Sequence, residues 1–220
     1  LSALEADKNP IVDEDETFNF LQTRTFTVVS EDNKETETYE ITVVPAETFN
    51  DVTPDWWYYD EVMTAANKGW INGMRPGYFE PNGTMTRGQF ATIIARILNY
   101  NPDNYPNTAF PDVPSDIYYS EAVAFCKENN IIDGDDKGNF NGEDPITREQ
   151  MAKILCQALQ LKVTVPEDKF DDDAKIAEWA KGYVYACQEA GIMEGDNGSF
   201  RPTDNATRAE GAAVLVRAFA

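Results

Sequence analysis

The sequence contains no histidine, and this absence removes several kinds of chemistry at once. Histidine is the commonest general base and the commonest metal ligand in proteins. Catalytic triads of the Ser-His-Asp or Cys-His kind are therefore excluded. The chain has three cysteines, and an odd number does not match a disulfide framework. We expect no catalytic residues, no bound metal and no cofactor.

Basic residues are scarce as well. The chain has 18 Lys and Arg residues against 39 Asp and Glu, for a net charge of -21. Nucleic acids and anionic membranes both require a basic surface, so neither is an expected partner. No apolar run approaches the roughly 18 residues of a membrane span, and no membrane insertion is expected. Since no signal peptide is visible and the chain starts at Leu1, we expect it to be a piece of a longer protein.

A repeat organises most of the chain. Each copy has four landmarks in the same order: the aromatic of a Phe-x-Asp motif, a glycine, a second phenylalanine and an arginine. Successive copies lie 60 or 61 residues apart. The landmarks are Phe49, Phe110 and Phe170; Gly73, Gly134 and Gly195; Phe79, Phe140 and Phe200; and Arg87, Arg148 and Arg208. Residues 48–105, 106–166 and 167–220 are thus three copies of one unit.

Each copy has the pattern of a helix, a loop and a second helix. In the first copy, the first helix is predicted from Trp57 to Lys68, and it ends at Gly69, a suitable C-terminal cap. Its apolar positions are Trp57, Val62, Ala65 and Ala66. The second helix is predicted to begin at Thr86, followed by the stripe of a helix with one buried face. That stripe is Phe90, Ile93, Ile94, Ile97 and Leu98.

The second helix of each copy begins with a capping box. In this motif a threonine side chain caps the helix, and a Gln or Glu three residues later reaches back to it. The pairs are Thr86 with Gln89, Thr147 with Gln150, and Thr207 with Glu210. The arginine after each threonine does not belong to the motif. A cation at this end of a helix costs up to about 1 kcal/mol, so the three arginines need another role.

The cysteines follow the repeat. Cys126 and Cys187 are equivalent, and their counterpart in the first copy is Ala65, whereas Cys156 aligns with Ala95 and Val216. Positions that hold Ala, Val or Cys are typically small and buried. A Cys126–Cys187 disulfide requires that two equivalent helices meet closely.

Residues 1–47 differ from the repeats. They hold 12 acidic and 3 basic residues. Two alternating runs around residues 31–34 predict a β-hairpin, with Phe26, Val28, Tyr39, Ile41 and Val43 as its apolar face. An isolated hairpin is only marginally stable in water. The segment resembles the last strands of an immunoglobulin-like sandwich; the alternatives are packing on the repeats or pairing with another chain.

The repeated unit resembles the S-layer homology module. The resemblance rests on Phe-x-Asp-Val, the aromatic near the first helix, the glycine-ended turn and the Thr-Arg helix start, and it covers residues 48–220. It implies a mainly α fold: three helix-loop-helix repeats in a pseudo-threefold arrangement around a central three-helix bundle, with grooves between modules. Such domains anchor exported bacterial proteins non-covalently to the cell wall. The implied location is extracellular, associated with the wall or an S-layer.

The implied partner is a secondary cell-wall polysaccharide attached to peptidoglycan, which usually carries a pyruvate ketal. The resemblance implies that an arginine beside a helix N-terminus, with its free backbone N–H groups, binds the ketal carboxylate. It implies further that an aspartate and an aromatic of each module line the groove, and a glycine of each module would let the backbone approach the ligand closely. The residues are Arg87, Arg148 and Arg208; Asp51, Asp112 and Asp172; Trp57, Tyr118 and Trp179; and Gly73, Gly134 and Gly195.

Structural roles are the alternative for the arginines, the aromatics and the aspartates. The arginines can pair with aspartates, the aromatics can belong to the core, and the aspartates can cap the first helices. The copies also depart from the family pattern. Gly88-Gln89 stands where the family has Ala-Glu, Tyr118 replaces Trp, and the third copy has Asp173 and one extra residue before Trp179.

The sequence offers little support for calcium binding or for glycoside hydrolysis. An acidic turn after Asp133 has part of the spacing of a calcium loop. However, Lys137 stands at a ligand position, and Asp144 stands where the loop needs a bidentate glutamate. A glycoside hydrolase needs two carboxylates, and no motif singles out a pair among the 39. The chain is therefore predicted to be a non-catalytic anchor. The alternatives are the wall-anchoring part of a surface glycoside hydrolase or a self-assembling S-layer protein.

Overall fold

The structure is a computed structural model that describes residues 2–5, 24–29, 36–41, 48–105, 109–163 and 170–220. The chain divides into two compact units, Leu1–Glu47 and Thr48–Ala220. Six α-helices lie in the described part of the second unit, which confirms the mainly α prediction. They are α1 (Tyr59–Asn67), α2 (Arg87–Ile97), α3 (Ser120–Glu128), α4 (Arg148–Ala158), α5 (Lys181–Glu189) and α6 (Arg208–Phe219), with short 3-10 turns at Pro102–Asn104 and Asp173–Lys175.

The first unit contains an antiparallel sheet in the order β1-β2-β3. Its strands are β1 (Ser2–Glu5), β2 (Arg24–Val29) and β3 (Thr36–Ile41). The predicted hairpin is confirmed by the pairing of β2 with β3, which sets Phe26 opposite Tyr39. Strand β1 adds to the other edge of β2 and was not predicted. Val43 and the turn at 30–35 lie outside the described residues.

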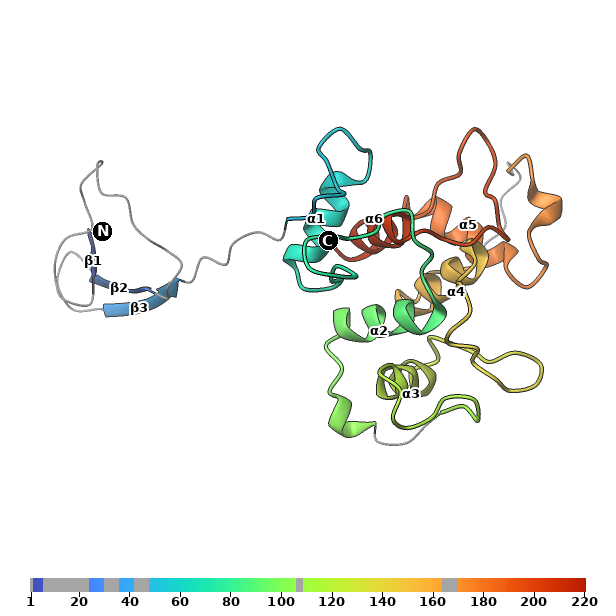
Figure 1. Ribbon diagram of the computed structural model, residues 1–220, viewed down its shortest axis with the longest axis horizontal. Helices are drawn as coiled ribbons and strands as arrows, with labels where there is room; N and C mark the ends of the chain where they lie inside the picture. The colour runs from blue at the N-terminus through green and yellow to red at the C-terminus, as the bar shows by residue number, and fades with distance from the viewer. Residues whose placement is uncertain (1, 6–23, 30–35, 42–47, 106–108, 164–169) are drawn as a thin grey trace. The chain divides into compact units, whose positions relative to one another are not determined.

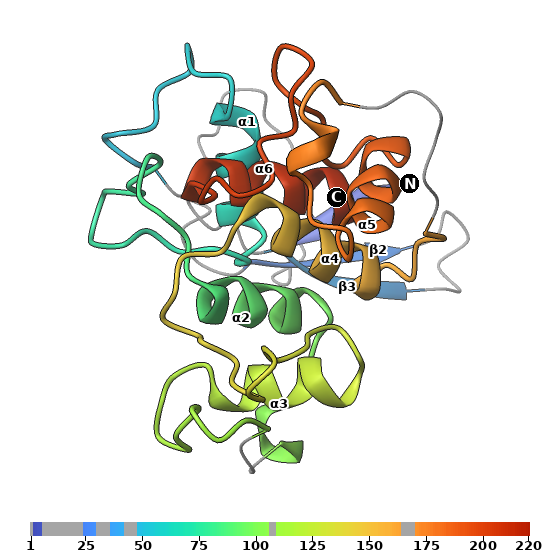
Figure 2. The same cartoon turned by 90° about the vertical axis from the view of Figure 1, so that its right-hand side faces the viewer.

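In the repeat unit, each module packs its first helix against the second helix of its neighbour. Helix α3 packs on α2, α5 packs on α4, and α1 packs on α6, so the pairing runs in a circle from the third module back to the first. Figures 1 and 2 show α2, α4 and α6 toward the middle of the unit, with α1, α3 and α5 outside them. The predicted pseudo-threefold arrangement around three central helices is present.

A closed ring of backbone hydrogen bonds joins the three central helices just before they begin. Met85 N–H donates to Ala206 O at 3.0 Å, Ala206 N–H to Ile146 O at 2.9 Å, and Ile146 N–H to Met85 O at 2.9 Å. All three residues are buried. Since every module gives one bond and receives one, removal of any module opens the ring.

The capping boxes are confirmed in all three copies. Thr86, Thr147 and Thr207 each accept a hydrogen bond from the backbone three residues on, and each receives the reciprocal contact from the Gln or Glu side chain. In α1, Val62, Ala65 and Ala66 are buried as predicted, but Trp57 lies in the turn before the helix and is 58% exposed. The prediction that Trp57 is an apolar-face residue of this helix is wrong, because the helix begins at Tyr59.

The cysteines are free and buried, as expected for small core positions. The thiol of Cys126 in α3 contacts Ala91 O of α2 at 3.6 Å, and the thiol of Cys187 in α5 contacts Ala152 O of α4 at 3.4 Å. The two equivalent cysteines therefore lie in different helix interfaces. Burial raises the pKa of both thiols to about 12, so neither forms a reactive thiolate at neutral pH.

No helix in the described residues is long and apolar enough to cross a membrane.

Candidate functional site: the arginine clamps and the Arg148 cavity

Each arginine after a capping threonine reaches into the next module. Its Nε–H donates to the carbonyl of that module's second phenylalanine, and a terminal nitrogen donates to a carbonyl of the preceding turn. The Nε bonds are Arg87 to Phe140 O at 2.9 Å, Arg148 to Phe200 O at 2.8 Å and Arg208 to Phe79 O at 2.9 Å. The second acceptors are Asp133 O at 3.4 Å, Glu194 O at 3.3 Å and Asn72 O at 2.7 Å.

The same guanidinium groups lie over the phenylalanine rings. The distances from guanidinium carbon to ring centroid are 4.8 Å for Arg87 and Phe140, 5.1 Å for Arg148 and Phe200, and 4.6 Å for Arg208 and Phe79. Burial lowers the pKa of all three arginines below the ordinary value, although a guanidinium stays charged in proteins. The arginines therefore act as clamps between modules.

The backbone N–H groups at the starts of the central helices are already bonded. In α4, Arg148 N–H donates to Asp204 O and Glu149 N–H to Pro202 O, each at 3.0 Å. Helices α2 and α6 make the equivalent bonds to the module that follows in the circle. The expectation of free backbone N–H groups for a ligand is therefore wrong. These donors hold the neighbouring module instead.

The three aspartates of the Phe-x-Asp motif bind the loop before the second helix. Both oxygens of Asp172 accept backbone bonds, from Phe200 N–H at 2.8 Å and Arg201 N–H at 2.9 Å. Asp51 and Asp112 make the same pair of contacts in their own modules. The residue after the phenylalanine has a positive φ in each copy, 59° at Arg201, and the aspartate holds this uncommon backbone. The aspartates do not cap the first helices, which start without a side-chain cap.

The three motif glycines are required by packing inside each module. A Cβ on Gly195 would lie 2.6 Å from Ser199 O and 2.8 Å from the ring of Phe170, and Gly73 and Gly134 meet equivalent atoms. The glycines therefore have a structural reason beside the predicted approach of a ligand.

The three predicted aromatics lie at the surface. Trp57 and Tyr118 are 58% exposed and Trp179 is 49% exposed. The alternative that they are core side chains is therefore wrong. An exposed aromatic face is available for stacking on a ligand.

Residues of all three modules meet in one cavity of about 390 Å³, here called the Arg148 cavity. Trp57 comes from the first module, Arg148 from the second, and Gly195 with two further arginines from the third. Three of the predicted site residues, Arg148, Trp57 and Gly195, therefore line the same cavity. Arg201 was not predicted, because the other modules have Glu80 and Asn141 at this position, and Arg217 was not predicted either.

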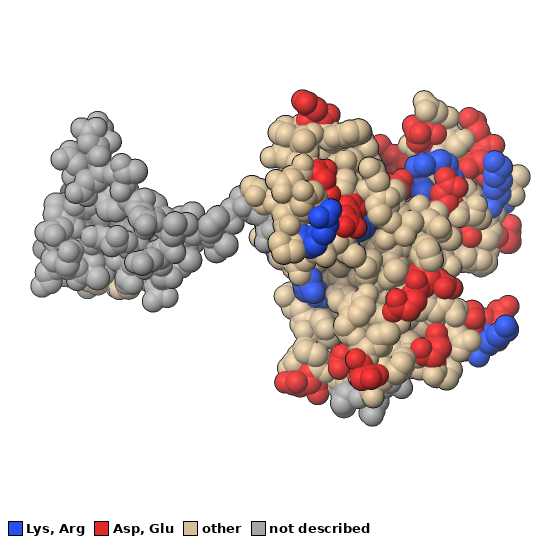
Figure 3. Space-filling view, viewed as in Figure 1, with Lys and Arg blue, Asp and Glu red and all other residues tan. Residues whose placement is uncertain are grey.

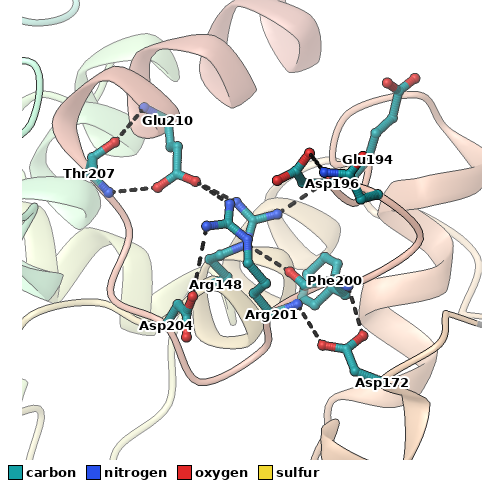
Figure 4. A network of polar contacts seen from close by, with 10 residues as sticks. Arg148, Asp172, Glu194, Asp196, Phe200, Arg201, Asp204, Thr207 and Glu210 are labelled. Atoms are coloured by element: carbon teal, nitrogen blue, oxygen red, sulfur yellow. Dashed lines mark hydrogen bonds and ion pairs between the residues drawn. The ribbon is translucent and has the colours of Figure 1, made fainter.

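Glu210 links the arginines of this cavity. Its Oε1 lies 3.1 Å from Arg148 and 2.9 Å from Arg201, while Oε2 accepts the Thr207 backbone N–H at 2.9 Å (Figure 4). Burial alone would raise the pKa of Glu210. The hydrogen bond from Thr207 and the two arginines have a larger, opposite effect, so the pKa lies below its ordinary value. Glu210 is therefore an ionised capping residue and an arginine partner at once.

The other two arginines have different surroundings. Near Arg87, Asp133 forms an ion pair with Lys153 at 2.9 Å, and Lys153 lies over Trp179 at 5.6 Å. Arg208 bonds to Asn72, the neighbour of Gly73, while Tyr118 contacts the capping residue Thr86. The threefold repeat of the backbone is therefore not a threefold repeat of the site.

The acidic turn after Asp133 is organised by its own polar groups. One oxygen of Asp135 accepts the backbone N–H groups of Lys137 and Asn139, each at 2.9 Å, and the other accepts from Asn141 at 3.0 Å. Across the described residues, no group of three or more acidic or cysteine side chains is placed to hold a metal ion. On the face seen in Figure 3, acidic side chains are spread over many points and basic ones are fewer.

Fold and site together define a binding module built from three repeats, with clamped interfaces and a cavity shared between them. The S-layer homology domain model matches residues 48–91, 109–152 and 169–212. The chain therefore belongs to the S-layer homology domain family. It is part of a cell-surface protein, and the domains of this family bind components of the cell wall.

The chain is similar to both enzymes and S-layer proteins. It is 37% identical over 174 residues to an amylopullulanase of Thermoanaerobacterium thermosulfurigenes, covering 76% of this chain and 9% of the relative. It is 35% identical over 174 residues to the exoglucanase XynX of Acetivibrio thermocellus, covering 76% and 16%. It is 32% identical over 176 residues to the S-layer protein sap of Bacillus anthracis, covering 77% and 21%. The chain thus spans a small part of the relatives it matches.

Proposed function

We propose that this chain attaches a bacterial surface protein non-covalently to the cell wall by binding an anionic polysaccharide in the Arg148 cavity. The ligand is a secondary cell-wall polysaccharide with a carboxylate-bearing sugar, and a pyruvate ketal is the expected carboxylate. One observation supports this proposal above all. Arg148, Arg201 and Trp57 come from three different modules and line the same cavity.

The cavity offers two complementary contacts for an acidic sugar. Each terminal nitrogen of a guanidinium carries two N–H groups. Arg148 uses one on each for Glu210 and Glu194 and is largely buried, so the more exposed guanidinium of Arg201, at 42%, is the accessible partner for a ligand carboxylate. Trp57 is exposed at the same cavity and can stack on the sugar ring. The volume of about 390 Å³ falls in the usual range for small-ligand sites, about 300–1,000 Å³.

Charge also favours this cavity as the anion site. Residues 48–220 carry a net charge of -12, so an anionic glycan is repelled by most of the surface. The cavity is an exception, because three arginines there balance three carboxylates. They are Arg148, Arg201 and Arg217 against Glu194, Asp196 and Glu210. A ligand carboxylate therefore meets little net repulsion and several guanidinium donors at this place.

We propose that the chain itself catalyses no reaction. Relatives named as enzymes match 76% of this chain, and a relative named as an S-layer protein matches 77%. Both kinds of relative therefore share nearly the same extent of this chain. One anchoring role fits both kinds of attached protein. The attached protein is thus either a surface glycoside hydrolase or a self-assembling S-layer protein, and residues 1–47 are proposed to end an immunoglobulin-like domain of it. Release of sugar by this chain alone would contradict the proposal.

Calorimetric titration with wall-polysaccharide fragments tests the ligand and the cavity together. The full chain is titrated with fragments before and after chemical removal of the ketal. Trp57→Ala is expected to weaken binding about tenfold, because stacking is lost without loss of fold. Tyr118→Ala and Trp179→Ala are matched controls, since these equally exposed aromatics lie outside the Arg148 cavity. Equal binding of both fragments, or equal losses in all three variants, would contradict the proposal.

A further inference from the structure

Trp56 is exposed to solvent, and the other two modules have no tryptophan at the equivalent position. It is 55% exposed and directly precedes Trp57. The 61-residue spacing makes Ile117 its counterpart in the second module and Glu178 its counterpart in the third. Because the fold accepts Ile or Glu at this position, packing does not require an indole there. Tryptophan is enriched at binding interfaces, so an exposed tryptophan that the fold does not need is a candidate contact for a ligand.

Trp56 lies at a hollow of its own, here called the Trp56 hollow. Its volume is about 320 Å³, and it is lined by Asp51, Trp56, Tyr58, Glu80, Asn82 and Gly83. The Trp56 ring is nearly parallel to that of Tyr58, with an interplanar angle of 9° and centroids 5.8 Å apart. Tyr58 is buried, so it holds the indole in a fixed orientation while most of Trp56 stays exposed.

The Trp56 hollow has charged lining residues of one sign, whereas arginines balance the carboxylates in the Arg148 cavity. Its charged lining residues are Asp51 and Glu80, both acidic. Both oxygens of Asp51 already accept backbone N–H bonds, at 2.8 and 2.7 Å. Glu80 has a weaker partner, Arg75 at 3.4 Å, and both side chains of that pair are exposed. An exposed pair of this kind contributes little, so Glu80 can exchange Arg75 for a ligand cation. The Arg208 guanidinium also interacts electrostatically with Glu80 and Asp51, but its Nε–H and one terminal N–H are bonded to the carbonyls of Phe79 and Asn72.

We propose that the Trp56 hollow binds a hexosamine residue with a free amino group, as a second subsite for the wall glycan. An aromatic face beside a carboxylate suits a ligand that presents both an apolar sugar face and an ammonium group. The sugar ring packs on Trp56 and its ammonium lies near Glu80. This subsite rests on the proposed function for the identity of the polymer, and it excludes the acidic sugar that the Arg148 cavity takes. Trp56 and Trp57, which are adjacent in the sequence, thus serve two subsites with different charged groups.

Fluorine NMR of the full chain, labelled with 5-fluorotryptophan, tests the subsite directly. The chain has four tryptophans, and single substitutions assign their signals. The probes are methyl glucosaminide, methyl N-acetylglucosaminide and methyl glucuronide. The Trp56 signal is expected to shift saturably with methyl glucosaminide, at least about fivefold more weakly with the N-acetyl sugar, and not with the glucuronide. A Trp56 signal that does not respond to methyl glucosaminide, or responds equally to the glucuronide, overturns the proposal.

Two variants convert the hollow into its counterpart in the second module without disturbing the fold. Glu80→Asn copies Asn141, and both positions have a positive φ, 61° and 57°. It is expected to weaken methyl glucosaminide binding at least about fivefold through loss of the carboxylate. Trp56→Ile copies Ile117 and should abolish the response of the neighbouring signals. The proposed function is tested separately by the Trp57 signal. If this signal does not shift when the ketal-bearing fragment is added, the proposed function is contradicted.

Discussion

Arg208 in the third module donates its Nε–H to the carbonyl of Phe79 in the first, at 2.9 Å and across 129 residues of sequence. The same guanidinium donates to Asn72 O at 2.7 Å. This contact closes the circle of modules, because the first and last repeats have no peptide connection. The arginine costs a little stability at its helix start, and its hydrogen bonds across the interface offset that cost.

Arg208→Ala is expected to destabilise the repeat unit by about 2–4 kcal/mol, because two carbonyl groups lose a charged donor at a buried site. The free energy of unfolding in urea measures the loss. Arg217→Ala is the matched control, since this half-exposed arginine has a 3.6 Å contact to Glu61 and should cost less than about 1 kcal/mol. Equal losses in the two variants would contradict the clamp. Binding assays on variants of the clamp arginines accordingly need a stability measurement beside them.

Asp172→Asn should weaken the fold rather than ligand recognition. The two carboxylate oxygens of Asp172 accept the backbone N–H groups of Phe200 and Arg201, at 2.8 and 2.9 Å. Asparagine replaces one of these oxygens with an NH₂ group, so one backbone N–H loses its acceptor. We expect a loss of about 1–3 kcal/mol in unfolding free energy. Affinity for the polysaccharide, corrected for the folded fraction, should stay within about twofold. A large loss of affinity in folded protein would show instead that Asp172 contacts the sugar.

Gly88→Ala tests why this copy departs from the family pattern. A Cβ on Gly88 would lie 2.6 Å from the ring of Tyr119, which is buried. Overpacking of this kind typically costs about 1–3 kcal/mol, although alanine favours helices. A lower midpoint in thermal unfolding is expected. The double variant with Tyr119→Ala should recover part of the clash energy, and a stabilised Gly88→Ala would show that the ring moves freely.

Glu210→Gln is expected to remove a pH-dependent part of the stability. Thr207, Arg148 and Arg201 hold the pKa of Glu210 below its ordinary value of 4.5 despite burial. The unfolded chain therefore binds this proton at a higher pH than the folded chain, so the contribution is complete above about 4.5 and is lost as pH falls through the folded pKa.

The variant copies Gln89 and Gln150, so the capping box stays possible. At neutral pH we expect a loss of about 1–2 kcal/mol from the ion pairs. Unfolding free energies measured from pH 7 down to about pH 3 should show this difference shrinking. A difference that stays constant over that range would mean that Glu210 is not the titrating group.

The elements within one module could be predicted from the sequence, whereas contacts between modules could not. Capping boxes are local, and a threonine with Gln or Glu three residues later defines the helix start at Thr86, Thr147 and Thr207. The acceptors of Arg148 are carbonyls of Phe200 and Glu194, 52 and 46 residues away, and nothing in the sequence marks a carbonyl as an acceptor. Strand β1 was missed for a similar reason, because four residues give too short a pattern.

Three of the predicted site residues, Trp57, Arg148 and Gly195, line one cavity, and their role in binding stays a prediction. The periodicity placed Trp57 on the first helix, yet the chain turns before Tyr59 and leaves the indole at the surface, where it serves the Arg148 cavity. Arg201 could not be predicted from the shared motif, because the other two copies have Glu80 and Asn141 at this position. Differences between repeats therefore carry information on the site that the shared motif lacks.

Sedimentation with purified cell-wall sacculi tests the central claim most directly. Wild type is compared with Arg201→Asn, which copies Asn141 at a position of equally positive φ, and with the control Lys127→Asn. The side chains of Arg201 and Lys127 are equally exposed, at 42%, but Lys127 lies outside the Arg148 cavity. We predict that wild type and the control bind intact sacculi, that Arg201→Asn binds at least about tenfold more weakly, and that removal of the polysaccharide abolishes binding. Wild-type binding by folded Arg201→Asn, or binding to sacculi without polysaccharide, would contradict the Arg148 cavity as the anchoring site.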